Sequence, residues 1–134
     1  MKVTIANHEI DTFINMLANP QSFRNNVAIK LSDELDWALR VNLKMMNTRY
    51  EIINEARQEL AKEFIDAGKV ENDHVKEEYL GEYNDCMVRL MMQKNELDFT
   101  PIKRDSFKGL SLSMPERDFL MLMVDEEAEN KEEK

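Results

Sequence analysis

The sequence predicts an α+β chain, mostly α, built on a long antiparallel helical hairpin with a small two-stranded sheet and two short helices. Three observations support this fold class. Val27 to Ala67 contains no Gly and no Pro, and its apolar residues recur at helical spacing. A second helical pattern follows after a short connection, which favours an antiparallel hairpin. Two short stretches, one at the N-terminus and one over residues 96–102, alternate with the period of a strand.

The first predicted strand lies at the N-terminus, where Val3 and Ile5 alternate with polar neighbours. Asn7 then fits the N-cap of a first helix, which Asn19 and Pro20 end. The inner face of this helix is apolar at helical spacing: Ile10, Phe13, Ile14 and Leu17. Residues 21–26 form a connector.

The long helix carries two neighbouring apolar ridges, which predict a buried stripe wider than a coiled-coil seam. The first ridge is Leu31, Leu35, Ala38, Met45, Ile52 and Ala56, and the second is Leu39, Leu43, Met46, Tyr50, Ile53, Leu60 and Phe64. Unbroken, this helix would be about 60 Å long, more than a compact domain of this size spans. Either it breaks near Lys30–Asp33, where Ser32 caps it, or one end projects. Gly68 closes it.

Asn72 is the expected N-cap of the next helix. The inner face of that helix is Val75, Tyr79, Tyr83, Cys86 and Leu90. Residues 96–102 then alternate as a strand, which Pro101 ends or confines to an edge, and the N-terminal strand is the natural partner. A capping box from Ser113 to Glu116 opens a last helix, Met114 to Val124.

Residues 1–124 are expected to form one domain, followed by a disordered acidic tail over residues 125–134. The whole chain of 134 residues has a formal net charge of −9. The tail holds six acids against two lysines, so it carries −4 and the rest carries −5. Such a highly charged segment has too few apolar residues to pack.

The composition excludes several classes of function. Three scattered glycines cannot form a phosphate-binding loop, and one cysteine cannot form an internal disulfide framework or a Cys-rich zinc site. The excess of acids argues against direct binding of duplex DNA. The N-terminus has no long apolar run, and no stretch is long enough to cross a bilayer. A cytoplasmic location is the expectation that remains.

Four acids stand four residues apart on the long helix: Glu51, Glu55, Glu59 and Glu63. Their carboxylates rise about 6 Å from one to the next, close to the spacing of phosphates along a nucleic-acid strand. One interpretation is an anionic row that mimics nucleic acid or docks in a basic groove of a protein. The other is an ordinary solvated helix face, with Arg57 and Lys62 nearby to compensate. The row drifts about 40° per step around the helix, which favours the second interpretation.

Three more residues of this helix stand out. Trp37, if exposed, is the first candidate for a contact anchor, because Trp is enriched at binding hot spots. Asn42 and Arg49 interrupt the apolar seam. Arg49 is expected to pair with a carboxylate such as Asp85 or to lie at the edge of the seam, and a buried polar group here is a hypothesis for fixing the register.

Residues that ligate metals or attack substrates are few and scattered. His8, His74 and Cys86 have no ligand spacing between them, so surface or capping roles for the histidines and a core role for the cysteine are favoured. No nucleophile motif is recognisable. We therefore expect no enzyme activity, no catalytic residues, no metal and no cofactor.

Several segments resemble an uncharacterised family of small proteins encoded by phages and prophages of Gram-positive bacteria. These segments are Val27 to Ser32, Leu39 to Met46, Tyr50 to Leu60, the opening Ile5-Ala6-Asn7 and the closing Leu112 to Pro115 with Phe119 to Val124. The loop from Asp66 to Asp73 is shorter than in many members of that family. The family offers no established catalytic residues to transfer.

The resemblance and the acidity together predict a phage accessory protein that acts by binding a protein in the bacterial cytoplasm. An inhibitor of a host defence complex, similar to an anti-CRISPR factor, fits this description, and its partner would be a basic nucleic-acid-binding protein. The alternative is a structural or assembly protein of the phage particle, in which the long helix packs into an oligomer. The sequence leaves the oligomeric state open.

Overall fold

A computed structural model describes residues 1–132 of the chain. The helices in this range are α1 (Asn7–Ala18), α2 (Asp33–Asp66), α3 (Glu77–Met92), α4 (Met114–Met121) and α5 (Glu126–Glu132), with one 3₁₀ turn, η1 (Arg104–Phe107). The strands are β1 (Lys2–Ala6), β2 (Val70–Glu71), β3 (His74–Val75) and β4 (Lys94–Asp98). The predicted fold class, α+β and mostly α with a long helical hairpin, is confirmed.

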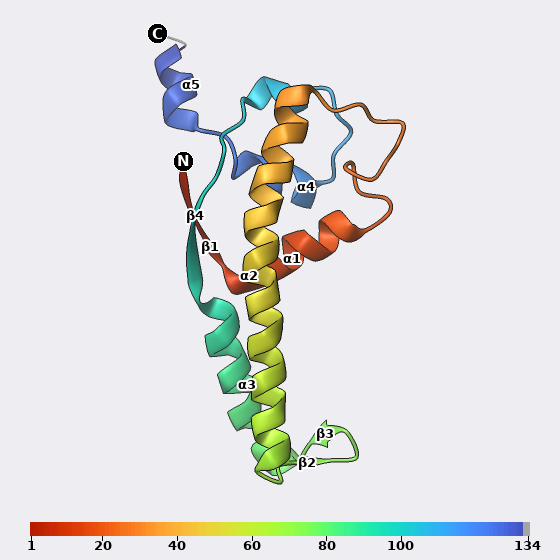
Figure 1. Cartoon of the computed structure of the whole chain (residues 1–134), viewed down its shortest axis with the longest axis vertical. Helices are drawn as coiled ribbons and strands as arrows, with labels where there is room; N and C mark the ends of the chain where they lie inside the picture. The colour runs from red at the N-terminus through yellow and green to blue at the C-terminus, as the bar shows by residue number, and fades with distance from the viewer. Residues whose placement is uncertain (133–134) are drawn as a thin grey trace.

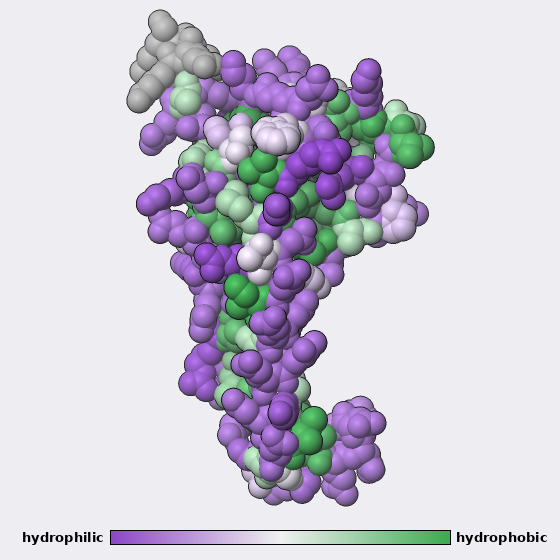
Figure 2. All heavy atoms as spheres, viewed as in Figure 1, coloured by the Kyte–Doolittle hydropathy of each residue, from purple (hydrophilic) through white to green (hydrophobic). Residues whose placement is uncertain are grey.

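The molecule has a wide head and a narrow arm (Figure 1). We call residues 51–92 the arm: they comprise the second half of α2, the β2–β3 hairpin at the tip, and α3. The head is the remainder of the described chain. Helix α2 belongs to both parts, and its 34 residues make it about 51 Å long. Figure 2 shows apolar side chains gathered over the head, whereas the arm in this view is mainly hydrophilic.

Helix α2 does not begin at Val27. It begins at Asp33, after Ser32, whose hydroxyl accepts a hydrogen bond from the Leu35 N–H at 3.3 Å. Both predicted alternatives therefore hold: the helix begins only after Ser32, and its C-terminal end projects from the head as part of the arm. The acids of the first turn favour this start, because the N-terminal end of a helix attracts negative charge.

The C-terminal end of α2 closes as predicted at Gly68. This residue has a φ of +72°, a left-handed conformation that glycine adopts without a steric penalty. Its N–H donates to the Ile65 carbonyl at 3.0 Å, and the Lys69 N–H donates to the Phe64 carbonyl at 2.9 Å. This pair of bonds is the Schellman arrangement that satisfies the last free carbonyls of a helix.

The predicted N-cap at Asn72 is wrong. Asn72 and Asp73 both have positive φ, +52° and +65°, and form the two-residue turn of the β2–β3 hairpin. Two successive left-handed residues are typical of the tight hairpin turn, and Asn and Asp tolerate that conformation. Val75 therefore lies in β3 instead of on the inner face of α3, which begins at Glu77.

Strand β1 pairs antiparallel with β4, in a register that places Val3 opposite Leu97. The expected pairing of the N-terminal strand with the later strand is confirmed, but β4 spans Lys94–Asp98, so it begins and ends earlier than the predicted stretch 96–102. Asn7 is the first residue of α1 and not its cap. Its side-chain amide donates to the Leu90 carbonyl at 2.7 Å and accepts from Asn95 at 2.8 Å. Asn7 thus ties the start of α1 to the end of α3.

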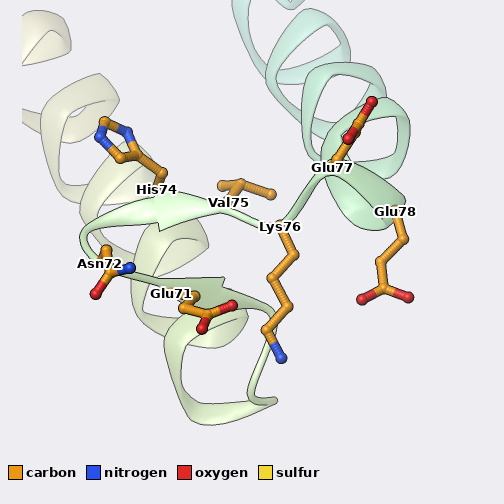
Figure 3. Close-up of a pocket in the computed structure, with 7 residues that line it drawn as sticks. All are labelled: Glu71, Asn72, His74, Val75, Lys76, Glu77 and Glu78. Carbon is orange, nitrogen blue, oxygen red and sulfur yellow. The ribbon is translucent and has the colours of Figure 1, made fainter.

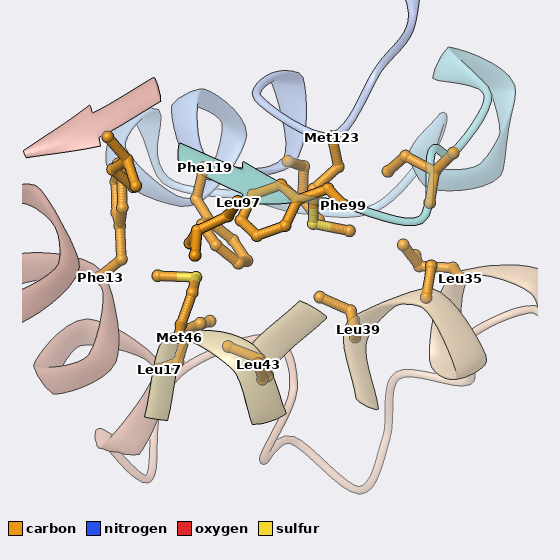
Figure 4. Close-up of a cluster of buried hydrophobic side chains, with 14 of the residues drawn as sticks. Phe13, Leu17, Leu35, Leu39, Leu43, Met46, Leu97, Phe99, Phe119 and Met123 are labelled. Carbon is orange, nitrogen blue, oxygen red and sulfur yellow. The ribbon is translucent and has the colours of Figure 1, made fainter. Parts of the chain in front are cut away.

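The apolar core lies in the head, between α1, the first half of α2 and the layer formed by β4 and α4 (Figure 4). Phe13 of α1 packs against Phe119 of α4 with ring centroids 5.2 Å apart. The second ridge of α2 faces this core, and Leu39, Leu43, Met46 and Ile53 are buried. The first ridge is buried only at its head end, at Leu35 and Ala38, whereas Ile52, at the start of the arm, is exposed.

Two buried polar side chains hold segments without regular secondary structure against this core by hydrogen bonds to their backbone. The Asn42 amide donates to the Thr100 carbonyl at 2.9 Å and accepts from the Thr100 N–H at 2.7 Å. The Glu116 carboxylate accepts from the backbone N–H groups of Phe23 at 2.8 Å and Ser113 at 3.0 Å. The predicted capping box at Ser113 is confirmed, but Glu116 also holds the distant loop at Phe23.

The tail prediction needs a correction within the described range. Residues 126–132 form helix α5, which contacts η1 through Arg104: the Arg104 N–H donates to Glu129 at 2.7 Å and its guanidinium to Glu126 at 3.2 Å. Acids near the helix start and a capping contact from Asp125 favour the helix locally. Residues 133–134 of the predicted tail lie outside the described residues.

Candidate binding surface on the arm

The four predicted acids all lie on the arm half of α2, and all four side chains are exposed. Within residues 1–132, none of these carboxylates takes part in an ion pair or a side-chain hydrogen bond. Glu51 and Glu63 are twelve residues apart, so the row extends about 18 Å along the helix. The opposite side of α2 faces α3 and buries Ile53 and Phe64.

Arg57 does not compensate this row, contrary to the expectation. Its guanidinium points to α1, where it pairs with Asp11 at 3.0 Å and also contacts the Asn54 amide oxygen. Its side chain is 29% exposed. Lys62 follows Glu59 by three residues and Glu55 by seven, so it lies on the same side of the helix as the acids. It is exposed and makes no ion pair among the described residues.

Asp66 extends the acidic side and was not singled out in the sequence. It follows Glu63 by three residues and Glu59 by seven, and it is exposed. We call the set Glu51, Glu55, Glu59, Glu63 and Asp66 the acidic face. The helical spacing is enough to place Asp66 beside Glu59 and Glu63. Because Asp66 is also the last residue of α2, the sequence pattern indicates a helix end there more strongly than a member of the acidic row. Five acids against Lys62 leave this side of the arm strongly negative.

Trp37 is 64% exposed, so the condition for treating it as a contact anchor is met. It lies at the head end of α2, beside the Asp36–Arg40 ion pair of 2.9 Å. Fourteen residues separate it from Glu51, which places it about 21 Å away along the axis and on nearly the same side of the helix. The structure therefore aligns Trp37 with the acidic face without bringing them into contact.

The remaining polar residues that the sequence singled out do not converge. Arg49 is exposed, and no Arg49–Asp85 ion pair forms in the described structure. His8 and His74 are exposed and Cys86 is half-buried. Among residues 1–132, no group of three or more potential metal ligands comes together.

A hollow of about 700 Å³ lies between the β2–β3 hairpin and the start of α3. Figure 3 shows the side chains that line it: Glu71, Asn72, His74, Val75, Lys76, Glu77 and Glu78. His74 points away from Lys76 and Glu71, and Glu77 points away from Glu78, so these polar groups do not surround a common centre. This arrangement does not build a compact ligand site.

Comparison with known proteins identifies no related protein. No family model, curated protein or solved structure matches the chain. The resemblance to small phage proteins therefore stays a prediction. In the part of the chain that the structure describes, no helix combines the length and apolar character needed to cross a membrane.

Proposed function

We propose that this chain is a non-enzymatic accessory protein that binds a protein partner through the acidic face of its arm. The observation that carries the proposal is the placement of Glu51, Glu55, Glu59 and Glu63, which are exposed, unpaired and carried on an arm that projects from the head. The regular spacing alone does not distinguish a binding surface from an ordinary solvated helix face, because both would repeat with the helical period. Such a face usually interleaves charges of both signs, whereas here Arg57 pairs with Asp11 of α1 and leaves Lys62 as the base among five acids.

The partner that fits this face is a protein with a basic groove that normally holds nucleic acid. Carboxylates that rise about 6 Å apart on a rigid helix would occupy positions that phosphates take in such a groove. The attraction between unpaired exposed charges also accelerates encounter and sets orientation. Trp37, farther along the same side of α2, is the proposed apolar anchor of the contact.

The biological setting that we propose is a phage accessory protein in the cytoplasm of a bacterial host, acting on a nucleic-acid-binding defence complex in the manner of an anti-CRISPR factor. The resemblance stated above and the acidic face support this setting. A role in assembly of the phage particle is the second candidate. It is favoured by α3, which has no buried residue and leaves apolar side chains exposed.

The experiment compares three baits in a lysate of the infected host: the wild-type chain, a variant with Glu51, Glu55, Glu59 and Glu63 changed to Gln, and a control. The control carries four neutralised acids on the head, all exposed and without ion pairs to the residues that the structure describes: Glu34→Gln, Asp105→Asn, Asp118→Asn and Glu127→Gln. Both variants gain the same net charge. We expect the wild type and the control to capture one nucleic-acid-binding protein that the arm variant loses.

Capture of the same proteins by all three baits would contradict the proposed role of the acidic face. Loss of the partner from both variants equally would also contradict it, because the effect would then follow net charge and not position. An assembly role predicts a different outcome, namely an open-ended oligomer of the chain itself that the four Gln substitutions leave intact.

A further inference from the structure

Helix α3 is the one helix of the hairpin that buries none of its side chains, although it is rich in apolar residues. Its inner stripe contacts α2, as the edge-to-face pair of Tyr83 with Phe64 shows. On the other side Leu80, Val88 and Met92 are 44%, 58% and 57% exposed. With Asn84 they form a row at four-residue spacing, which we call the outer row: Leu80, Asn84, Val88 and Met92.

Gly81 lies beside the outer row, and neither packing within its own chain nor its backbone conformation requires a glycine there. Its φ is not positive, and a Cβ built on it meets nothing within 4 Å. Glycine inside a helix is unfavourable relative to alanine, so its presence calls for a compensating gain. Small residues let a second helix approach closely, and packing of another helix on the outer row would use that space.

One flank of the outer row carries an acid, Glu78, and a base, Arg89, which a second copy in antiparallel orientation would bring opposite each other. Glu78 and Arg89 are eleven residues, or about three turns, apart and lie on the same side of α3. Neither makes an ion pair in the described structure, and the Arg89 guanidinium donates a hydrogen bond to the Cys86 sulfur at 3.4 Å. Glu82, on the same flank, is already paired with Lys69 at 2.9 Å. Asp85 lies next to Asn84, so a two-fold axis there would set it near its own copy, one repulsion against two Glu78–Arg89 attractions.

We propose that α3 is a dimer interface, and that the occupant of the outer row is the α3 helix of a second copy in antiparallel orientation. A two-fold axis near Asn84 places Leu80 opposite Val88 of the second copy and Asn84 opposite itself. The same axis brings Glu78 of each copy opposite Arg89 of the other copy, so the contact contains two such charge pairs. Such an isologous contact closes on itself, and two hairpins joined in this way form a four-helix arrangement.

This interface is separate from the acidic face, which lies on α2, so it does not rest on the proposed function. A central Asn that meets its own copy would also fix the register of the pair, as single buried polar residues do in coiled coils. A dimer of this kind would present two acidic faces on two arms.

Sedimentation equilibrium of the full chain tests the proposal. We expect the wild type to be a dimer at about 0.5 mM, a concentration at which even a dissociation constant near 100 μM leaves most chains paired. Val88→Glu places a charge in the outer row and should give a monomer. Val27→Glu changes an equally apolar and fully exposed side chain on the head and should leave the dimer intact. Circular dichroism verifies that both variants stay folded.

A charge swap tests the antiparallel arrangement itself. Glu78→Arg and Arg89→Glu should each raise the dimer dissociation constant about tenfold, because attraction becomes repulsion. The double variant Glu78→Arg/Arg89→Glu should return to within about threefold of the wild type. A monomeric wild type, a dimer that survives Val88→Glu, or a double variant without rescue would overturn the proposal. Binding of a different protein to the outer row in place of a second copy would overturn it as well.

Discussion

At the scale of single residues, the chain uses buried polar side chains to hold segments that lack regular structure. Asn42 is fully buried in the first third of α2, where its amide donates to the Thr100 carbonyl and accepts from the Thr100 N–H. Glu116 is 8% exposed and holds the loop at Phe23 to the start of α4. The hypothesis that a buried polar group on α2 fixes the register applies to Asn42, whereas Arg49 lies at the surface.

Changing Asn42 to Leu removes both hydrogen bonds while roughly keeping the volume of the side chain. The Thr100 N–H and C=O would then be left in the core without a partner, at a cost of about 3 kcal/mol in the free energy of unfolding. Urea denaturation measures this loss. Asn47→Leu is the matched control on the exposed side of α2, and it should change stability by less than about 0.5 kcal/mol. Equal effects of the two substitutions would contradict the role given to Asn42.

Glu116 gives a second residue-scale prediction, which concerns pH. Burial is the largest influence on the pKa of its carboxyl and raises it, but the hydrogen bonds from Phe23 and Ser113 together hold the pKa below its ordinary value of 4.5. A carboxyl with a lowered pKa in the folded state stabilises the protein above its unfolded pKa. This contribution disappears as the pH falls through the folded pKa.

The wild type should therefore be more stable than Glu116→Gln by about 1–2 kcal/mol at neutral pH, and the difference should shrink as the pH falls below 4.5. Chemical denaturation of both proteins across this pH range measures the difference. Glu59→Gln, an exposed carboxyl on the arm, serves as the control. A gap between wild type and Glu116→Gln that stays constant at every pH would contradict the assignment.

At the scale of elements, the sequence predicts those features whose signals are local and unambiguous. Ser32 and Gly68 bound α2 because capping and left-handed closure depend on the residues themselves. Asn72 misled the prediction because an Asn that follows a helix fits an N-cap and a hairpin turn equally well. The contact of Asn7 with Leu90 spans most of the chain, so no local pattern indicates it.

The arm is an element with little core of its own, and Phe64 is its main buried anchor. Phe64 is 5% exposed, packs edge-to-face on Tyr83 at 5.1 Å, and has the Lys69 ammonium 5.1 Å from its ring centre. Changing Phe64 to Ala should cost about 3 kcal/mol in the stability of the arm. Because the head has a separate core, the loss should remain local.

Native-state hydrogen exchange tests this prediction. Amides of α3 and of the end of α2 should exchange faster in Phe64→Ala, while those of α1 and the first half of α2 keep their protection. Ile65→Ala alters the neighbouring side chain, which is 59% exposed, and should leave exchange nearly unchanged. Equal loss of protection in head and arm would show that the two parts unfold as one unit.

At the scale of the whole molecule, the division into head and arm separates the apolar core from the proposed binding surface. The head contains nearly all of the buried apolar residues, and the arm carries the acidic face away from it (Figure 1). The sequence predicts the row of acids, because helical spacing is enough to place them on one side. It does not predict that Arg57 would leave this side and that Lys62 alone would remain among the acids, because Arg57 pairs with Asp11 of α1, a contact distant in sequence.

We propose that the acidic face occupies a groove in which the partner otherwise holds nucleic acid. Fluorescence anisotropy of labelled nucleic acid bound to the captured partner measures this competition most directly. The wild-type chain should release the nucleic acid, less effectively as salt screens the charges, and the variant with four Gln substitutions should not. A ternary complex of the chain, the partner and the nucleic acid, with anisotropy unchanged or increased, would contradict the claim.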